Sequence, residues 1–142
     1  MTAPVLPGPA ARPANPVLAG LRVPVIAAPM LLVSGPDLVI AACRAGVIGS
    51  FPTANPRGEG ELETWLTRIE AALRAAEAAG ERVAAYVPNL IVHRSNPRLE
   101  PDLTAILAHR PAAVITSVGS PAAVIPALQG ADDQDAPLRF HL

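Results

Sequence analysis

The chain has 142 residues and a formal net charge of −1, with 51% hydrophobic and 16% charged residues. This length allows one domain with a buried core, and the composition is too apolar for a disordered chain. The small net charge leaves no basic face for nucleic acid or anionic lipid. An aromatic content of 3% leaves few stacking platforms for single-stranded nucleic acid.

Targeting signals are not evident, and we expect a cytoplasmic protein without a membrane or nucleic-acid partner. No apolar run reaches the roughly 18 residues of a membrane span. The first 20 residues are rich in Pro and Ala and lack the basic start and apolar segment of a secretory signal. We therefore expect 1–20 to be a flexible tail and 21–142 to be the folded unit. Cys43 is the single cysteine, and its apolar helical surroundings predict a small buried hydrophobe.

The first predicted elements are a strand, a helix and a second strand. The apolar run 23–28 predicts a buried strand, and 36–45 predicts a helix with Pro36 in its first turn. Ser34, with Asp37 three residues on, gives a weak capping signal. Gly46 lies where a helix C-terminal glycine is expected, and 47–51 is the next apolar run.

The middle of the chain carries the clearest helix, at 62–79, where apolar residues recur at spacings of three and four. A strand is predicted at 83–92 and a helix at 99–109. A strand at 112–117 and a short helix from Ser120-Pro121 through Leu128 follow. A polar, turn-like stretch covers 131–137, and 138–142 begins a fifth strand candidate.

Strands alternating with helices predict parallel βα units. Two architectures fit this pattern. One is an open doubly wound sheet, and the other is part of a (β/α)₈ TIM barrel, a fold that typically needs about 250 residues. Composition and periodicity leave both open. The strand ends contain neither a G-x-G-x-x-G turn nor a P-loop, so a nucleotide-binding doubly wound domain loses support.

The strand ends resemble those of nitronate monooxygenases, formerly called 2-nitropropane dioxygenases. The matching segments occur in order along roughly 21–128: Val25-Ile26-Ala27-Ala28-Pro29-Met30 with Ser34-Gly35-Pro36, then 40–49, Asn89-Leu90-Ile91-Val92-His93 with Asn96-Pro97-Arg98, and Val114-Ile115-Thr116-Ser117-Val118-Gly119. The resemblance implies the first four to five βα units of an FMN-binding TIM barrel. It also implies oxidation of alkyl nitronates with O2 to a carbonyl compound and nitrite.

The same resemblance implies which residues contact the flavin. The backbone of Ala28, Pro29 and Met30 would pass along the isoalloxazine ring. The amide of Asn89 would offer a donor and an acceptor, and Ser117 or its neighbour Thr116 would line the next strand end. The structural alternatives are a core methionine, a turn-forming asparagine and a serine bonded to nearby backbone.

A base that removes a substrate proton would suit this chemistry, and His93 is the weak candidate because it follows the third strand. His109 is expected to serve the end of its helix, where the helix dipole favours a cation. Arg94 and Arg98 are expected to be surface charges.

The sequence carries no match to the family's later strands, whose glycine-rich loops bind the FMN phosphate. We therefore expect a truncated barrel that binds FMN weakly or not at all, with exposed sheet edges that could support self-association. Two alternatives stay open. One is a related FMN barrel, such as a flavin-dependent enoyl reductase acting on an acyl-carrier substrate. The other is a non-catalytic α/β fragment that self-associates.

Overall fold

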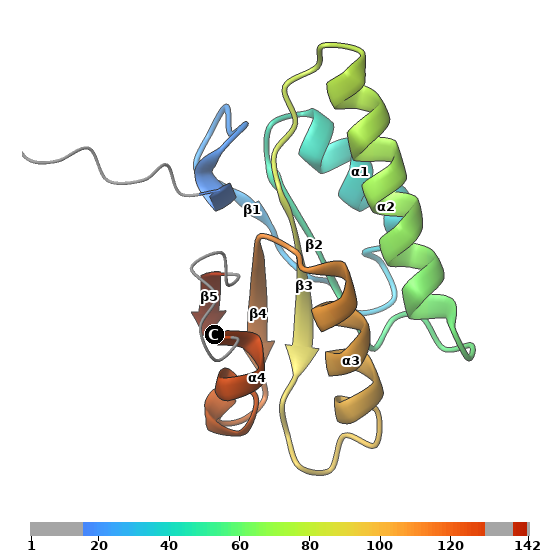
Figure 1. Cartoon of the computed structure of the whole chain (residues 1–142), viewed down its shortest axis with the longest axis vertical. Coiled ribbons are helices and arrows are strands. Elements are labelled where there is room, and N and C mark those ends of the chain that lie inside the picture. Colours follow the sequence, from blue (N-terminus) through green and yellow to red (C-terminus); the bar gives the residue numbers. More distant parts are fainter. Residues whose placement is uncertain (1–15, 130–137, 142) are drawn as a thin grey trace, which may run out of the picture.

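The computed structural model describes residues 16–129 and 138–141 of the chain. Its strands form one sheet, made of β1 (Ile26–Ala27), β2 (Ile48–Pro52), β3 (Tyr86–Ile91), β4 (Ala113–Ser117) and β5 (Leu138–His141). Strand order in the sheet follows chain order, and every neighbouring pair is parallel (Figure 1). The connecting elements are η1 (Pro16–Leu18), α1 (Pro36–Arg44), α2 (Glu61–Ala78), α3 (Leu99–His109), η2 (Pro121–Ala123) and α4 (Ile125–Gln129).

The predicted order of strands and helices is confirmed, and the helix predicted at 99–109 coincides with α3. β1 is shorter than the apolar run at 23–28. The N–H of Val25 donates to the carbonyl of Val23 at 2.8 Å, so this stretch turns instead of extending the ladder. Val23, Val25 and Ile26 are exposed, as expected for a sheet edge that no further strand covers among the described residues. The polar stretch 131–137 lies outside the described residues.

Local sequence explains where α1 begins and ends. Pro36 occupies the first turn, where its missing N–H costs nothing, and Gly46 follows the helix at a φ of +80°. The capping role expected for Ser34 is wrong. The N-cap is Gly35, without a side-chain hydrogen bond, because the Ser34 hydroxyl accepts the N–H of Met30 instead.

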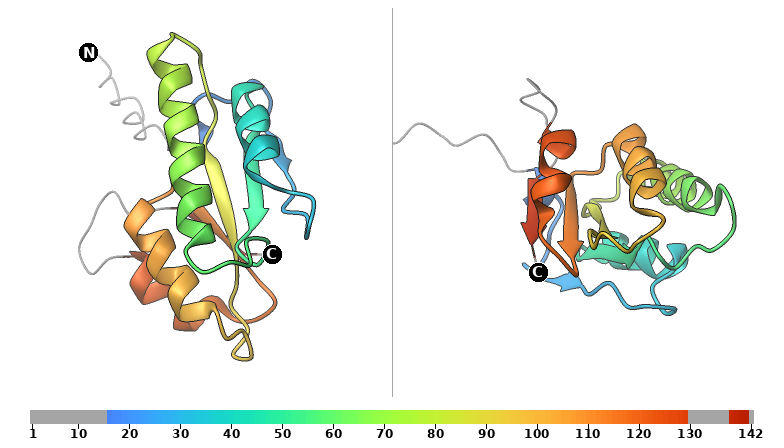
Figure 2. Two further views of the ribbon diagram at one scale, coloured as in Figure 1. Left: turned by 90° about the vertical axis from the view of Figure 1, so that its right-hand side faces the viewer. Right: turned by 90° about the horizontal axis from the view of Figure 1, so that it is seen from below.

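The helices α1 to α4 pack against the same face of the sheet (Figures 1 and 2). One cluster joins α1, α2 and α3 to Phe51 and Tyr86, and a second joins α3 and α4 to Leu90 and Val114. Register places Phe51, Tyr86, Leu90 and Val114 on one side of the sheet. A doubly wound sheet has helices on both faces and a reversal of strand order, and the described residues show neither. The fold is therefore a partial (β/α)₈ barrel.

Helix α1 packs so closely against β2 that position 49 requires a glycine. A Cβ on Gly49 would lie 2.6 Å from the carbonyl oxygen of Val39 and 2.9 Å from the sulfur of Cys43, both on α1. Cys43 is fully buried, as the sequence predicted, and its thiol donates to the carbonyl of Ala85 at 3.3 Å. Burial raises the pKa of the Cys43 thiol to about 11. The cysteine therefore serves packing.

The opposite face of the sheet, the inner face of the barrel, has its own apolar cluster. It contains Ile48, Val87, Ala113 and Ile115, together with Val17 of η1. Val17 is fully buried, so the chain joins the core before residue 21, where composition placed the start of the folded unit. The Pro- and Ala-rich composition of 1–20 does not indicate that Val17 packs against the inner face of the sheet.

Candidate functional site

The carboxyl ends of the strands meet at one end of the sheet, and two of the expected flavin contacts share its inner face there. Asn89 in β3 lies opposite Pro52 of β2 and Ile115 of β4, and Ser117 lies opposite Ile91 of β3. Alternate residues along a strand share a face. Asn89 and Ser117 are therefore diagonal neighbours on the inner face, where a barrel binds its ligand.

Asn89 has an unusual environment. The residue is 8% exposed, and its side-chain oxygen Oδ1 is buried without a hydrogen-bond partner in the described part of the chain. Buried polar atoms in folded proteins nearly always have partners, and an orphaned acceptor is costly. This oxygen is thus a free acceptor on the inner face at the carboxyl end of β3.

The segment after β1, Ala28 to Met30, is held in place by hydrogen bonds from side chains of later residues. Ala28 and Met30 are exposed and Pro29 is half-buried. The hydroxyl of Ser34 accepts the N–H of Met30 at 2.9 Å, and the Asn55 amide donates to the Met30 carbonyl at 3.0 Å. The backbone groups of Met30 are therefore occupied, and this segment offers mainly its apolar surface to a ligand.

An apolar rim continues from this segment. This rim consists of the consecutive residues Leu31, Leu32 and Val33, which are 62%, 69% and 63% exposed; Val118, also 62% exposed, follows β4, which two strands separate from β1. Large aliphatic side chains exposed together are uncommon on a protein surface and mark contact sites. The carboxyl end of the sheet therefore combines a buried acceptor with an apolar border.

Ser117 and Thr116 point to different sides. Ser117 is half-buried on the inner face, whereas Thr116 pairs with Leu90 in register and lies on the helix-facing side, buried. Of the two residues expected at this strand end, the geometry favours Ser117.

His93 follows β3 and is exposed at the same end of the sheet. Its Nδ1 lies 2.6 Å from the Ser95 hydroxyl and accepts the Ser95 N–H at 3.2 Å. A Cβ on Gly119 would lie 3.4 Å from the backbone of His93, so the turn after β4 packs against this residue. These contacts tie Nδ1 to its own loop.

Arg98 is not the surface charge that the sequence suggested, whereas Arg94 is exposed. The Arg98 guanidinium donates to the Asp102 carboxylate at 2.9 Å and to the carbonyl of Pro56. Asp102 is buried, and burial raises the pKa of its carboxyl although Thr53 and Arg98 oppose the shift. Sequence reasoning missed Asp102, because a charged residue within an amphipathic helix usually lies on the solvated face.

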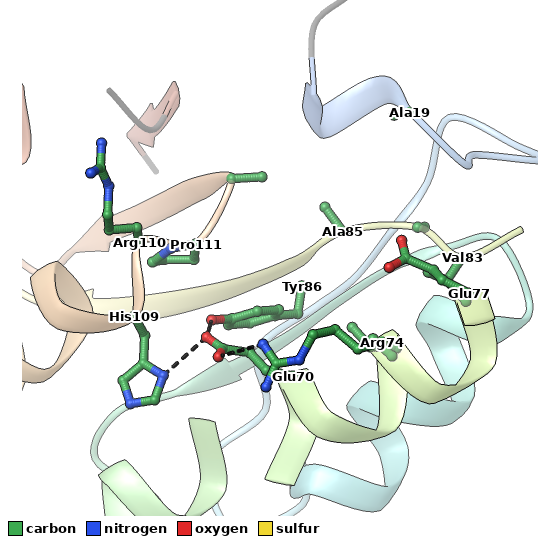
Figure 3. Close-up of a pocket in the computed structure, with 13 residues that line it drawn as sticks. Ala19, Glu70, Arg74, Glu77, Val83, Ala85, Tyr86, His109, Arg110 and Pro111 are labelled. Atoms are coloured by element: carbon green, nitrogen blue, oxygen red, sulfur yellow. Dashed lines mark hydrogen bonds and ion pairs between the residues drawn. The ribbon is translucent and has the colours of Figure 1, made fainter. Parts of the chain in front are cut away.

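A separate cavity of about 350 Å³ lies near the amino end of β3, away from these strand ends (Figure 3). There Glu70 accepts the Tyr86 hydroxyl at 2.7 Å and lies 3.0 Å from His109, which also contacts Glu63 at 2.6 Å. Burial lowers the pKa of His109, but its contacts with Glu63 and Glu70 outweigh this effect and raise it. Each of these side chains is satisfied by another, so the cluster joins α2 to the end of α3; the role expected for His109, a cation at the end of its own helix, did not include these carboxylates.

Metal and membrane features are not found among the described residues. No group of three or more His, Cys, Asp or Glu side chains there could hold a metal ion. Nor does that part of the chain contain a helix that is both long and apolar enough to cross a bilayer.

Comparison with known proteins gives a structural likeness only. No family model matches the sequence, and no curated protein matches it. FabK from Thermotoga maritima matches 93% of this chain with a TM-score of 0.67 and 14% sequence identity, over 37% of its own length. A point mutant of that protein matches with a TM-score of 0.65 at the same identity, over 40% of its length. The chain thus spans about two fifths of the FabK chains, and it shares their fold over that part of the barrel.

Proposed function

We propose that this chain forms the flavin-ring side of an FMN-dependent oxidoreductase, with alkyl nitronate oxidation by O2 as its reaction. The observation that carries the proposal is the orphaned oxygen of Asn89. It lies on the inner face at the carboxyl ends of parallel strands, which is where (β/α)₈ enzymes bind their ligands. The partial barrel fold and the resemblance of the strand ends to nitronate monooxygenases point to the same site.

The residues present fit the ring of a flavin. Asn89 Oδ1 would accept the imide N–H of the ring, which would supply the partner that this oxygen lacks among the described residues. The segment of Ala28, Pro29 and Met30 would pack along the ring through apolar surface, because the polar backbone groups of Met30 are already bonded. Ser117 would line the next strand end. When bound, the flavin would accept electrons from the substrate.

The described residues do not include the part of a barrel that generally binds the phosphate of FMN. In barrels it is generally held after strands 7 and 8, and the described residues reach only β5. We propose that these residues supply ring contacts and little affinity for the phosphate. The 142-residue chain alone should then bind FMN and riboflavin about equally and weakly.

The apolar rim favours a substrate with an aliphatic part, since Leu31, Leu32 and Val33 continue directly from the ring-facing segment. His93 is the candidate base at this end, but its Nδ1 accepts the Ser95 N–H, so the neutral ring carries its hydrogen on Nε2 and Nδ1 must leave Ser95 before it can take a proton. The second candidate function is flavin-dependent enoyl reduction on an acyl-carrier substrate, which the likeness to FabK supports about as well.

The flavin proposal can be tested by titrating the isotopically labelled chain with FMN and with riboflavin while following backbone amide chemical shifts by NMR. We expect perturbations at Ala28, Met30, Asn89 and Ser117, with similar affinities for the two ligands. The Asn89→Leu variant should lose at least about tenfold in affinity, which corresponds to one strong hydrogen bond. Perturbations centred on the Glu70–His109 cluster, or none at these strand ends, would overturn the proposal.

The two candidate reactions consume different reagents. Nitronate oxidation would release nitrite from an alkyl nitronate in air without a nicotinamide cofactor. Enoyl reduction would oxidise NADH or NADPH in the presence of a crotonyl thioester. Turnover in the second assay without nitrite release in the first would replace the nitronate reaction by enoyl reduction.

A further inference from the structure

One side chain outside the expected flavin contacts holds the loop after β1 in place. Asn55 lies in the connection between β2 and α2. Its Oδ1 accepts the N–H of Leu32 at 2.9 Å, and its Nδ2 donates to the carbonyls of Met30 at 3.0 Å and Ser34 at 2.8 Å. A single amide therefore binds three backbone groups of a loop more than 20 residues away in sequence.

This loop needs such support because its backbone is unusual. Leu32 has a φ of +65°, a region that side chains other than glycine rarely adopt. The Asn55 acceptor binds the N–H of this same residue. Ser34 adds a second tie, since its hydroxyl accepts the Met30 N–H and donates to the Ala28 carbonyl at 3.4 Å. The surrounding contacts thus determine a conformation that the loop would not hold by itself.

The segment that carries Asn55 is itself anchored to the rest of the site. The N–H of Thr53 donates to the backbone carbonyl of Asn89 at 2.9 Å, and the N–H of Asn55 donates to Pro52 at 3.0 Å. On the other side, Arg98 donates to the carbonyl of Pro56 and is itself held by Asp102. Residues 52–56 therefore connect the loop after β1 to Asn89, the buried acceptor.

We propose that Asn55 is a positioning residue of the flavin site. It sets where Ala28–Met30 and the apolar rim lie relative to Asn89, so that both sides of the ring site keep one geometry. The inference rests on the proposed function and extends it to a residue with no ligand contact of its own.

The three hydrogen bonds of the Asn55 amide are called the Asn55 clamp below. Hydrogen exchange of the flavin-free chain first tests whether this clamp holds the loop after β1. Asn55→Ala should raise the exchange rate of the Leu32 amide at least about tenfold, because that amide loses its acceptor, while β3 amides keep their protection. Asn55→Asp keeps an acceptor for Leu32 but loses both donors, so its effect should be intermediate. The matched control is Asn96→Ala, which removes an amide in the loop after β3 that donates to the Ile91 carbonyl, and which should leave Leu32 exchange unchanged.

Flavin titration then separates positioning from a purely structural role. In Asn55→Ala we expect riboflavin to bind about tenfold more weakly and to perturb Met30 less, while the Asn89 amide still responds. Unchanged Leu32 exchange, or unchanged affinity despite a loosened loop, overturns this inference alone. No flavin response in the unsubstituted chain overturns the proposed function, and the role of Asn55 with it.

Discussion

Replacing Asn89 by leucine should make the flavin-free chain more stable. The Asn89 oxygen is buried without a partner in the described residues. Such an acceptor costs about 1–3 kcal/mol of desolvation that no hydrogen bond repays. Leucine removes that cost and adds apolar burial, although its extra methyl volume offsets part of the gain. We expect Asn89→Leu to raise the free energy of unfolding by about 1 kcal/mol, which shifts a urea midpoint upward by roughly 0.5 M.

The matched comparison is Asn96→Leu, since Asn96 is an asparagine in the adjoining loop whose amide is bonded. Its Nδ2 donates to Ile91 at 2.8 Å and its Oδ1 accepts the Arg98 N–H at 3.0 Å. Losing both bonds should lower stability by about 1–3 kcal/mol. Urea unfolding followed by circular dichroism measures both variants. If Asn89→Leu destabilises the chain as much as Asn96→Leu, Asn89 has a structural role and the argument for a ligand acceptor fails.

Three further outcomes follow from the packing and the pKa shifts. Gly49→Ala should cost about 2–3 kcal/mol in urea unfolding, because its Cβ would meet the Val39 carbonyl at 2.6 Å; a loss below about 0.5 kcal/mol would mean that α1 can shift away. The pKa of His109 is raised in the folded chain, so its stabilising contribution is complete below its ordinary pKa and declines as pH rises through the raised value. Urea midpoints measured from pH 6 to 9 should show this decline in the parent and not in His109→Gln, and equal profiles would refute it. Cys43, with its pKa near 11, should react with a thiol reagent at pH 8 at least about 100-fold more slowly in the folded than in the unfolded chain, and comparable rates would show that the thiol is accessible.

Local patterns in the sequence were sufficient to predict most of the fold. The apolar stripe of 99–109 and the glycine after α1 are signals of period and backbone freedom, and both correspond to the observed boundaries. β1 was predicted too long, because an apolar run does not reveal that Val25 bonds back to Val23. The burial of Val17 depends on inner-face residues of β2 to β4, far along the chain, and so has no local signal.

The candidate site was also predictable from the sequence only in part. Asn89 stood out in the sequence as an amide within an apolar run, and the structure adds that its oxygen is buried and has no hydrogen-bond partner within 16–129 and 138–141. Its contact with flavin stays a prediction. Asn55 and Arg98 were not recognised, because their importance lies in bonds to loops 23 and 42 residues away. Such pairings follow from how the βα units pack side by side and leave no periodic trace in the sequence.

The order of the strands also bears on how the sheet assembles. Each strand pairs with the one that precedes it in the chain, and no described pairing skips a neighbour. Every new pairing closes only the βα connection just completed, so the chain entropy lost at each step stays modest. Strand order in chain order therefore requires only loop closures of one βα unit at a time. Asn55 follows β2 and the loop that it binds precedes α1, so this contact joins the first two βα units. The loop after β1 is thus tied to a segment whose own anchors, the Asn89 carbonyl and Arg98, come only with β3 and the loop after it.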